Sequence, residues 1–271
     1  MAKTMFVTGA TKNTGFAIAR RFASDGWNVA VSSRDQASSS AAAGRLKEEF
    51  PQVETLGVRM DPANVDDIRA AFAQIAEKFG GLDAFVSNAA NLGVGLSILN
   101  TTPEEYDSVM NANARGTFFG AQEAVKLMKG GGAMVFVSSV HQLRSVPGRI
   151  CYTVSKAAIG GMVRSMAVEL GHLGIRVNSV LAGAIRTERW NALSEEQIAT
   201  WRSRYPVGRE SYMDEIAAAV RFLCSDEAAT ISGVEMPVDS GLGASLLQYR
   251  ADWAKNDTYN VKYWEKGKTE K

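Results

Sequence analysis

The sequence alternates short apolar runs with longer stretches in which apolar and polar residues recur at helical spacing. Each run has the length of a buried strand, and strands that alternate with helical stretches indicate βαβ units and a mostly parallel sheet. The pattern predicts strands at residues 5–8, 29–32, 53–58, 84–87, 133–137, 175–180 and 234–238. It predicts helices at residues 15–25, 40–50, 65–79, 103–129, 152–170 and 214–224.

Right-handed crossovers between parallel strands would place helices on both faces of the sheet. The predicted fold class is therefore α/β, a single-domain, Rossmann-like, doubly wound parallel sheet of about seven strands. Two segments have no strand partner in this scheme. Residues 186–211 are predicted to be a lid inserted into a domain of residues 1–245, and residues 246–271 form a C-terminal extension.

Composition narrows the possible functions. The chain of 271 residues is 46% hydrophobic and 22% charged, and its net charge of +1 gives no reason to expect nucleic acid or a membrane as partner. No apolar stretch approaches the ~20 residues that span a bilayer. Cys151 and Cys224 suggest a reducing cytoplasm rather than a disulfide framework. His141 and His172 have no cysteine beside them, so we expect no metal site.

A glycine-containing loop follows the first predicted strand and precedes the first helix. Its sequence is Thr8-Gly-Ala-Thr-Lys-Asn-Thr-Gly15. In this position a dinucleotide pyrophosphate meets a helix N-terminus, and glycine permits the close backbone approach. Asn13 is one of the residues that tolerate a positive φ. The alternative is an ordinary strand-to-helix turn.

A tyrosine and a lysine, Tyr152 and Lys156, stand four residues apart, so a helix would place both on one face. A nearby ammonium group favours the phenolate, and we expect Lys156 to lower the pKa of Tyr152. Ser139 follows an apolar run and would lie at the carboxyl end of a strand, where open α/β sheets bind ligands. Taken singly, each residue is equally well explained as an ordinary cap or a solvated charge.

The chain resembles the short-chain dehydrogenase/reductase family in several motifs that follow the family's order. The loop at residues 8–15 resembles TGxxxGxG, with Asn13 at the middle glycine. The resemblance extends to Ser87-Asn-Ala-Ala90 for the NNAG turn, Asn113, the Ser139, Tyr152 and Lys156 triad, Ala182-Gly-Ala-Ile-Arg-Thr187 for PGxIxT, Glu215-Ile-Ala217 and Val238-Asp-Ser-Gly241. It implies that residues 1–245 form a dinucleotide-binding catalytic domain.

The resemblance also implies roles for individual residues. Tyr152 would exchange a proton with the substrate oxygen, Ser139 would polarise the carbonyl, and Lys156 would bind the nicotinamide ribose. Asn113 would hold a water that links Lys156 to solvent. The cofactor-binding residues implied by loop and motif positions are Gly9, Thr11, Lys12, Asn13, Thr14, Gly15, Ser33, Arg34, Asp61 at the adenine, Asn88, Ala89, Tyr152, Lys156, Gly183, Ile185 and Thr187.

The end of the second strand bears on the choice of cofactor. An NAD site places an acid there, whereas an NADP site must accept a phosphate. Ser33 stands at the position of the acid, Arg34 offers a planar fork suited to phosphate, and Lys12 supplies a second cation. Asp35 is an alternative acid, but its spacing predicts that it points elsewhere. We therefore expect NADP (NADPH/NADP+), with NAD less favoured.

These features predict an NADP(H)-dependent oxidoreductase that interconverts a ketone or aldehyde with the corresponding alcohol by hydride transfer. The lid is rich in arginine, which suggests a polar, oxygenated substrate such as a sugar, sugar acid or keto acid. The alternative is that most of these arginines face water or neighbouring subunits. The candidate substrate contacts are His141, Arg144, Arg189 and Trp190.

Other functions remain open at this stage. A 3-oxoacyl, steroid or other hydrophobic ketone reductase is an alternative, and a catalytically silent NADP-binding regulator is another. An enoyl reductase is disfavoured, because that branch resembles YxxxxxxK whereas this chain has YxxxK. The resemblance further implies a homotetramer or homodimer, and the expected location is the cytoplasm.

The extension contains five aromatic residues, whereas disordered tails are poor in aromatics. We therefore expect residues from Gln248 onward to pack on a neighbouring subunit, where symmetry brings the tail within reach. Truncation after Leu247 should then reduce oligomer size or raise the KM for substrate. Size-exclusion chromatography and steady-state kinetics measure both, and a truncated enzyme unchanged in both would contradict the expectation.

Overall fold

A computed structural model describes residues 2–245, and the C-terminal extension predicted at residues 246–271 lies outside the described residues. Its centre is a seven-stranded parallel sheet in the order β3-β2-β1-β4-β5-β6-β7. The strands are β1 (Thr4–Val7), β2 (Asn28–Ser33), β3 (Thr55–Arg59), β4 (Ala84–Ser87), β5 (Gly132–Ser139), β6 (Ile175–Ala182) and β7 (Glu235–Val238). The predicted fold class is confirmed, and each predicted strand is present with ends shifted by at most two residues.

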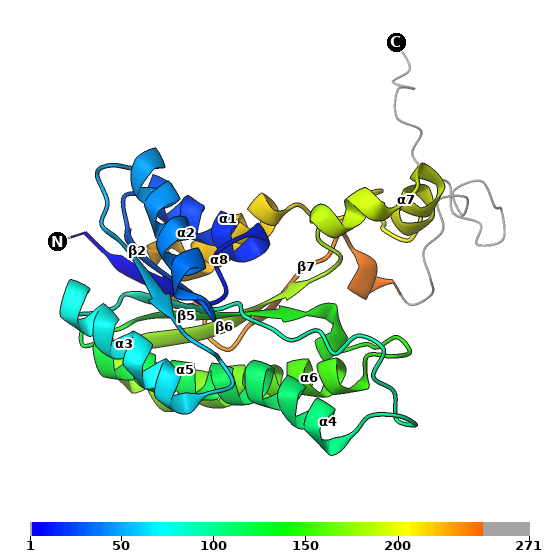
Figure 1. Cartoon of the computed structure of the whole chain (residues 1–271), viewed down its shortest axis with the longest axis horizontal. Coiled ribbons are helices and arrows are strands. Elements are labelled where there is room, and N and C mark those ends of the chain that lie inside the picture. The colour runs from blue at the N-terminus through cyan, green and yellow to red at the C-terminus, as the bar shows by residue number, and fades with distance from the viewer. Residues whose placement is uncertain (1, 246–271) are drawn as a thin grey trace, which may run out of the picture.

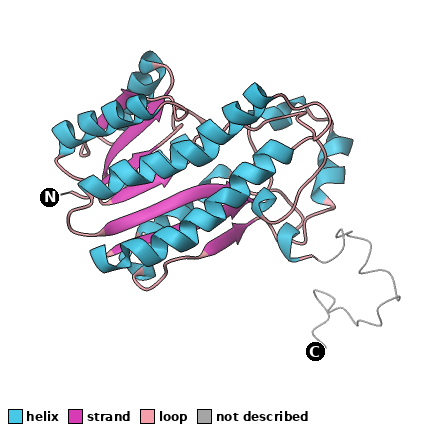
Figure 2. Cartoon of the chain, turned by 90° about the horizontal axis from the view of Figure 1, so that it is seen from below, coloured by secondary structure: helices cyan, strands magenta, loops and turns pink. Residues whose placement is uncertain are grey.

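Helices cover both faces of the sheet (Figures 1 and 2). One layer contains α1 (Asn13–Ser24), α2 (Gln36–Glu49) and α8 (Met213–Cys224), and the other contains α3 (Val65–Phe79), α5 (Gly116–Leu127) and α6 (Ile150–Leu170). The shorter elements are α4 (Pro103–Met110), η1 (Asn111–Arg115), η2 (Val140–Gln142), η3 (Gly171–Leu173), η4 (Glu188–Ala192), α7 (Glu195–Arg202), η5 (Asp226–Ala228) and η6 (Leu242–Ala244).

The sheet separates two hydrophobic cores, because successive side chains of a strand point to opposite faces. On β1, Met5 and Val7 join the core under α1, α2 and α8, whereas Phe6 joins the core under α3, α5 and α6. Because both faces of the sheet are covered, every residue of β1 is buried. This explains why the strands appear in the sequence as continuous apolar runs.

The prediction of one continuous helix over residues 103–129 is wrong in detail. The segment consists of α4, the π-helical turn η1 and then α5. The wide turn contains the buried Asn113, and it is followed by Gly116, where a Cβ would lie 2.4 Å from the carbonyl oxygen of Pro62. A π turn adds one residue to an otherwise helical pattern, so apolar periodicity does not reveal it.

The segment predicted as a lid contains η4 and α7, and a bridge between Ile185 and Ser211 brings its two ends together. Figure 1 shows α7 and α4 on opposite sides of the same end of the sheet, the end at which the strands terminate. Within residues 2–245, no helix is long and apolar enough to cross a membrane. The same part of the chain has no group of three or more His, Cys, Asp or Glu side chains arranged to hold a metal ion.

Candidate active site

The carboxyl ends of β1 and β4 are joined by side-chain hydrogen bonds. The hydroxyl of Thr8 accepts from the backbone N–H groups of Asn88 (2.9 Å) and Ala89 (3.0 Å). The amide nitrogen of Asn88 donates to the carbonyl oxygens of Thr8 and Gly9, both at 3.0 Å. Thr8 was not among the predicted site residues, although a threonine directly after a buried strand was the signal available. This strand pair is the point where the strand order reverses, and such a point is where doubly wound sheets bind ligands.

The predicted cofactor loop has the backbone that a phosphate requires. Gly9 has φ +64°, and a Cβ there would lie 2.9 Å from the Cα of Ala89. A Cβ at Gly15 would lie 2.4 Å from the carbonyl oxygen of Gly9. Asn13 has φ 51°, the positive value that its residue type tolerates. No side chain caps the first turn of α1 after Lys12, so its N–H groups are available to an anion.

After β2, the carboxylate of Asp35 is used in hydrogen bonds within the protein, whereas the nearby cations Arg34 and Lys12 are not. The Asp35 carboxylate caps α2 by accepting from the backbone nitrogen (2.8 Å) and hydroxyl (2.6 Å) of Ser38. These bonds lower the pKa of Asp35 and direct it to the helix, as the spacing predicted. Within residues 2–245, neither Arg34 nor Lys12 has a side-chain hydrogen bond or an ion pair.

Two further side chains near the glycine loop and β3 bond to the backbone. Asp61 accepts from the backbone nitrogen of Ala63 (3.0 Å), so its carboxylate shapes its own turn. Arg45, which the sequence analysis missed, donates to the carbonyl oxygen of Thr11 (2.8 Å) and stacks over the ring of Phe16, 4.0 Å from its centroid. Arg45 thus ties α2 to the glycine loop, and no motif in the sequence indicated this contact.

Tyr152 and Lys156 lie on α6, as predicted, but their electrostatics differ from the expectation. The amine of Lys156 is buried and donates to the carbonyl oxygen of Val137 (2.8 Å), while lying 5.6 Å from the centroid of the Tyr152 ring. Burial lowers the pKa of Lys156 to about 8. Burial also raises the pKa of Tyr152, and the hydroxyl of Ser139 and the charges of Arg149 and Arg189 only oppose this. The prediction that Lys156 holds the pKa of Tyr152 below its ordinary value is therefore wrong for this structure, because desolvation of the phenol dominates and the opposing groups are Ser139, Arg149 and Arg189.

Ser139 ends β5, two residues beyond the predicted end of that strand. It is buried beside the Tyr152 hydroxyl, its own oxygen accepts from the backbone nitrogen of His141 (3.2 Å), and it donates to the carbonyl oxygen of Ala182 (3.4 Å). The hydroxyl is thus placed at the strand end where the sequence predicted it. Its long bond to Ala182 is the weaker of the two, and exchanging it for a substrate carbonyl would cost little.

Asn113 is fixed by three bonds from its side chain. Its oxygen accepts from the backbone nitrogen of Asn91 (2.6 Å), and its nitrogen donates to the carbonyl oxygen of Asn91 (2.8 Å) and the hydroxyl of Ser155 (2.9 Å). Ser155 in turn donates to the carbonyl oxygen of Tyr152 (2.8 Å). The amide therefore links the loop after β4 to the turn of α6 that contains Tyr152 and Ser155. Its predicted contact with a water stays a prediction.

The four predicted substrate contacts lie in different environments. The His141 ring packs edge-on against Tyr152 at 5.4 Å, and burial lowers its pKa. Arg189 lies near enough to Tyr152 for its charge to favour the phenolate. Arg144 donates to the carbonyl oxygen of Gly243, and Trp190 is buried against Trp201 within the lid. The structure thus brings His141 and Arg189 to the tyrosine, whereas Arg144 and Trp190 hold neighbouring segments together.

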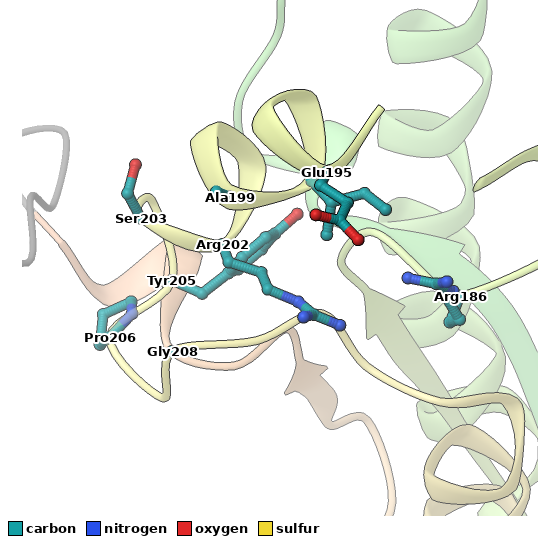
Figure 3. A pocket seen from close by; sticks show the side chains of 9 residues that line it. Arg186, Glu195, Ala199, Arg202, Ser203, Tyr205, Pro206 and Gly208 are labelled. Atoms are coloured by element: carbon teal, nitrogen blue, oxygen red, sulfur yellow. The ribbon is translucent and has the colours of Figure 1, made fainter. Parts of the chain in front are cut away.

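The lid arginines are largely paired within the protein. Arg186 (3.1 Å) and Arg202 (2.8 and 2.9 Å), which line one space beside α7 (Figure 3), both contact Glu210, which is completely buried. The guanidinium of Arg202, foremost, holds the pKa of Glu210 at about 2. Arg209 pairs in the same way with Glu215 (2.9 Å), whose pKa is also about 2. These arginines therefore stabilise the lid, and their number does not by itself indicate a polar substrate.

Two loops beside Tyr152 expose apolar side chains. The backbone nitrogen of Gly95 donates to the carbonyl oxygen of Gly148 (3.1 Å), and Arg149 donates to that of Leu92 (2.8 Å), so the two loops are joined. A Cβ at Gly93 would lie 3.8 Å from the backbone nitrogen of Tyr152. The exposed apolar residues on these loops are Val94, Ile98, Leu99, Leu143 and Val146. The loops next to Tyr152 therefore expose apolar surface.

Comparison with known proteins shows which family the chain belongs to. A family sequence model described as "Enoyl-(Acyl carrier protein) reductase" matches residues 9–243. The chain is 34% identical over 239 residues to the 3alpha-hydroxysteroid dehydrogenase of Mediterraneibacter gnavus, covering 88% of this chain and 95% of that protein. It is 34% identical over 245 residues to the 3-oxoacyl-[acyl-carrier-protein] reductase MabA of Mycobacterium tuberculosis, covering 90% and 94%.

Solved structures agree with these relatives. Levodione reductase superposes with a TM-score of 0.84 at 28% identity, covering 90% of this chain and 98% of that one. A 3-ketoacyl-ACP reductase from Sinorhizobium meliloti superposes with a TM-score of 0.80 at 32% identity, covering 89% and 99%. The chain is a member of the short-chain dehydrogenase/reductase family of oxidoreductases, which confirms the resemblance noted in its motifs.

The buried amine of Lys156 should make stability depend on pH. Its pKa is about 8 in the folded chain and 10.5 when unperturbed, so between these values the unfolded chain holds a proton that the folded chain has lost. Stability of the wild type should therefore rise with pH relative to Lys156→Met, by up to about 3 kcal/mol between pH 8 and 10.5. Urea unfolding at several pH values measures the difference. The exposed Lys126→Met variant is the control, and a wild-type-minus-Lys156→Met difference that does not change with pH would contradict the prediction.

Proposed function

We propose that this protein is an NADP(H)-dependent oxidoreductase that interconverts a ketone and a secondary alcohol by hydride transfer. One observation carries the proposal. Ser139 at the end of β5 lies beside Tyr152 and Lys156 of α6, at the same edge of the sheet as the glycine loop that follows β1. The close backbone approach at Gly9 and Gly15 and the uncapped first turn of α1 fit the pyrophosphate of a dinucleotide. When bound, the nicotinamide supplies or accepts the hydride.

The protein's own residues would orient the substrate and move the proton. Ser139 would donate a hydrogen bond to the carbonyl oxygen, which polarises the carbon for attack. Tyr152 would transfer its proton to the same oxygen as negative charge develops there. Because burial raises the pKa of Tyr152, the phenol carries at neutral pH the proton that ketone reduction requires. Lys156 and Asn113 would hold the ribose and a proton path, respectively.

The arrangement after β2 supports NADP(H) over NAD(H). Ser33 occupies the position where an acid would select NAD, and Asp35 is committed to capping α2. Arg34 and Lys12 have no side-chain partner in the described part of the chain, so both cations are free to receive a 2′-phosphate.

We propose a ketone with an apolar body as the substrate, such as a 3-oxoacyl thioester or a 3-oxosteroid. The loops beside Tyr152 expose apolar side chains, and the lid arginines that suggested a sugar or keto acid are paired with Glu210 and Glu215. The names of two relatives, a hydroxysteroid dehydrogenase and a 3-oxoacyl reductase, support the same class. His141 and Arg189, which lie near Tyr152, would contact the polar end of the substrate.

The other candidates have less support. Although the matching family description names an enoyl reductase, the YxxxK spacing resembles the carbonyl-reducing branch. A silent regulator would not need to bury a lysine beside a tyrosine at a stability cost. We also propose a homodimer or homotetramer, because α5 and α6 expose the apolar side chains of Phe118, Val154 and Val168. The expected cytoplasmic location stays a prediction.

Removing only the phenolic hydroxyl tests the proposed chemistry. Tyr152→Phe should reduce kcat for NADPH-dependent reduction of acetoacetyl thioester or a 3-oxosteroid by about 10²–10⁴-fold, because a positioned proton donor is lost. NADPH affinity, followed by nucleotide fluorescence, should change little. Tyr106→Phe on the exposed face of α4 is the matched control. Substantial activity in Tyr152→Phe would show that another group supplies the proton.

Reversing the charge after β2 tests the cofactor assignment. Arg34→Asp should raise the KM for NADPH by roughly ten- to a hundredfold, since a charge-assisted contact worth about 1.5–3 kcal/mol is replaced by repulsion. The KM for NADH should fall or remain unchanged. Lys129→Asp, with the same charge change just before the amino end of β5, should leave both constants unaltered. A wild type that uses NADH and NADPH equally well would refute the assignment.

A further inference from the structure

One arginine of α2 contacts both the glycine loop and the helix that follows it. The guanidinium of Arg45 donates to the carbonyl oxygen of Thr11 (2.8 Å) and lies over the ring of Phe16, 4.0 Å from its centroid. Helices α1 and α2 belong to the same layer on the sheet (Figure 1), and Arg45 joins them at the loop. Within residues 2–245, Arg45 forms no ion pair. These two contacts, rather than a carboxylate, therefore set its position.

The two contacts of Arg45 lie on either side of Lys12. The carbonyl of Thr11 belongs to the same planar peptide unit as the N–H of Lys12. The backbone nitrogen of Phe16 donates to the carbonyl oxygen of Lys12 (3.3 Å). Arg45 therefore holds the peptide that precedes Lys12 and also packs on the residue that binds the carbonyl of Lys12.

Lys12 depends on its backbone for its orientation. Its conformation is extended, with φ −158° and ψ 175°, and its side chain makes no capping bond to α1. The side chain is exposed, and in the part of the chain that the structure describes it has neither a hydrogen bond nor an ion pair. The direction of its Cα–Cβ bond follows from the peptide planes on either side. A rotation of the Thr11–Lys12 peptide would therefore move the ammonium group.

We propose that Arg45 is a positioning residue for NADP(H), which acts through Lys12 and raises the affinity for the 2′-phosphate. The inference rests on the proposed function, in which Lys12 and Arg34 receive that phosphate. A cation whose backbone is already fixed loses less conformational freedom when the phosphate binds.

The same argument predicts a difference between the two cofactors. NADH has no 2′-phosphate, so its binding does not use Lys12. The first-turn N–H groups of α1, which would bind the pyrophosphate of either cofactor, are oriented by the helix itself. Loss of Arg45 should therefore weaken NADPH and leave NADH nearly unchanged.

Fluorescence titration of NADPH and NADH into the full-length, cofactor-free protein tests the proposal. Arg45→Met should raise the Kd for NADPH about three- to tenfold, the effect of a lost hydrogen bond, and that for NADH by less than about twofold. Lys12→Gln should raise the Kd for NADPH about tenfold. In the Lys12→Gln background Arg45→Met should have no further effect, because both changes remove one contact. Arg69→Met on α3, in the other helix layer, is the matched control.

Two outcomes of the titration would overturn the role of Arg45 alone. Additive losses in the double variant would show that Arg45 acts on the cofactor by its own charge. Equal losses for NADPH and NADH would show that it only maintains the shape of the loop. A Lys12→Gln variant that binds NADPH as the wild type does would refute the proposed use of Lys12 itself, and the role of Arg45 with it.

Trypsin digestion without cofactor gives an independent readout. Trypsin cleaves after lysine, and it requires a segment that can leave its folded conformation. Cleavage between Lys12 and Asn13 should be about three- to tenfold faster in Arg45→Met than in the wild type or in Arg69→Met, since the hydrogen bond that restrains the peptide is lost. Phe16→Leu, which removes the ring under the guanidinium, should act in the same direction. Cleavage at the wild-type rate in Arg45→Met would overturn the proposal.

Discussion

The site depends on the junction between β1 and β4, where the two halves of the sheet diverge. The hydroxyl of Thr8 and the amide of Asn88 join the loops that leave these strands, and Gly9 lets the two backbones meet without a Cβ between them. The glycine loop and the turn after β4 are thereby held in one arrangement. Because α1 starts directly after that loop, its free N–H groups are aimed at the same place. The backbone arrangement that the proposed dinucleotide would need is therefore formed by the protein alone.

The first turns of α6 place two ionisable side chains where burial disfavours their charged forms. Burial lowers the pKa of Lys156 and raises the pKa of Tyr152, because desolvation destabilises the charged form of each group. Bonds from Lys156 to Val137 and from Asn113 to Asn91 and Ser155 offset part of that cost. The π turn η1 places Asn113 within reach of the loop after β4. Perturbed titratable groups gathered at one cleft are typical of active sites.

The lid is held mainly by charge. Glu210 has no exposed surface and accepts from two arginines, one near each end of the segment between β6 and α8. Without these arginines Glu210 would be a buried carboxylate with no counter-charge, which is unfavourable. Arginines that the sequence suggests as substrate contacts can therefore instead stabilise their own segment by pairing with an acid.

The sequence by itself determined the order of the strands and of the long helices, the parallel sheet, and the family to which the motifs belong. These features depend on local periodicity and turn residues, which short stretches of sequence contain, and on the rule that parallel strands all end at the same edge of a sheet. Even the orientation of Asp35 could be predicted, because its partner Ser38 is three residues away. Tertiary structure alone decided which long-range partner each polar group found. Arg186 pairs with Glu210, Lys156 donates to the carbonyl oxygen of Val137, and desolvation raises the pKa of Tyr152. None of these could be predicted, because local residue spacing does not indicate burial or pairing between distant segments.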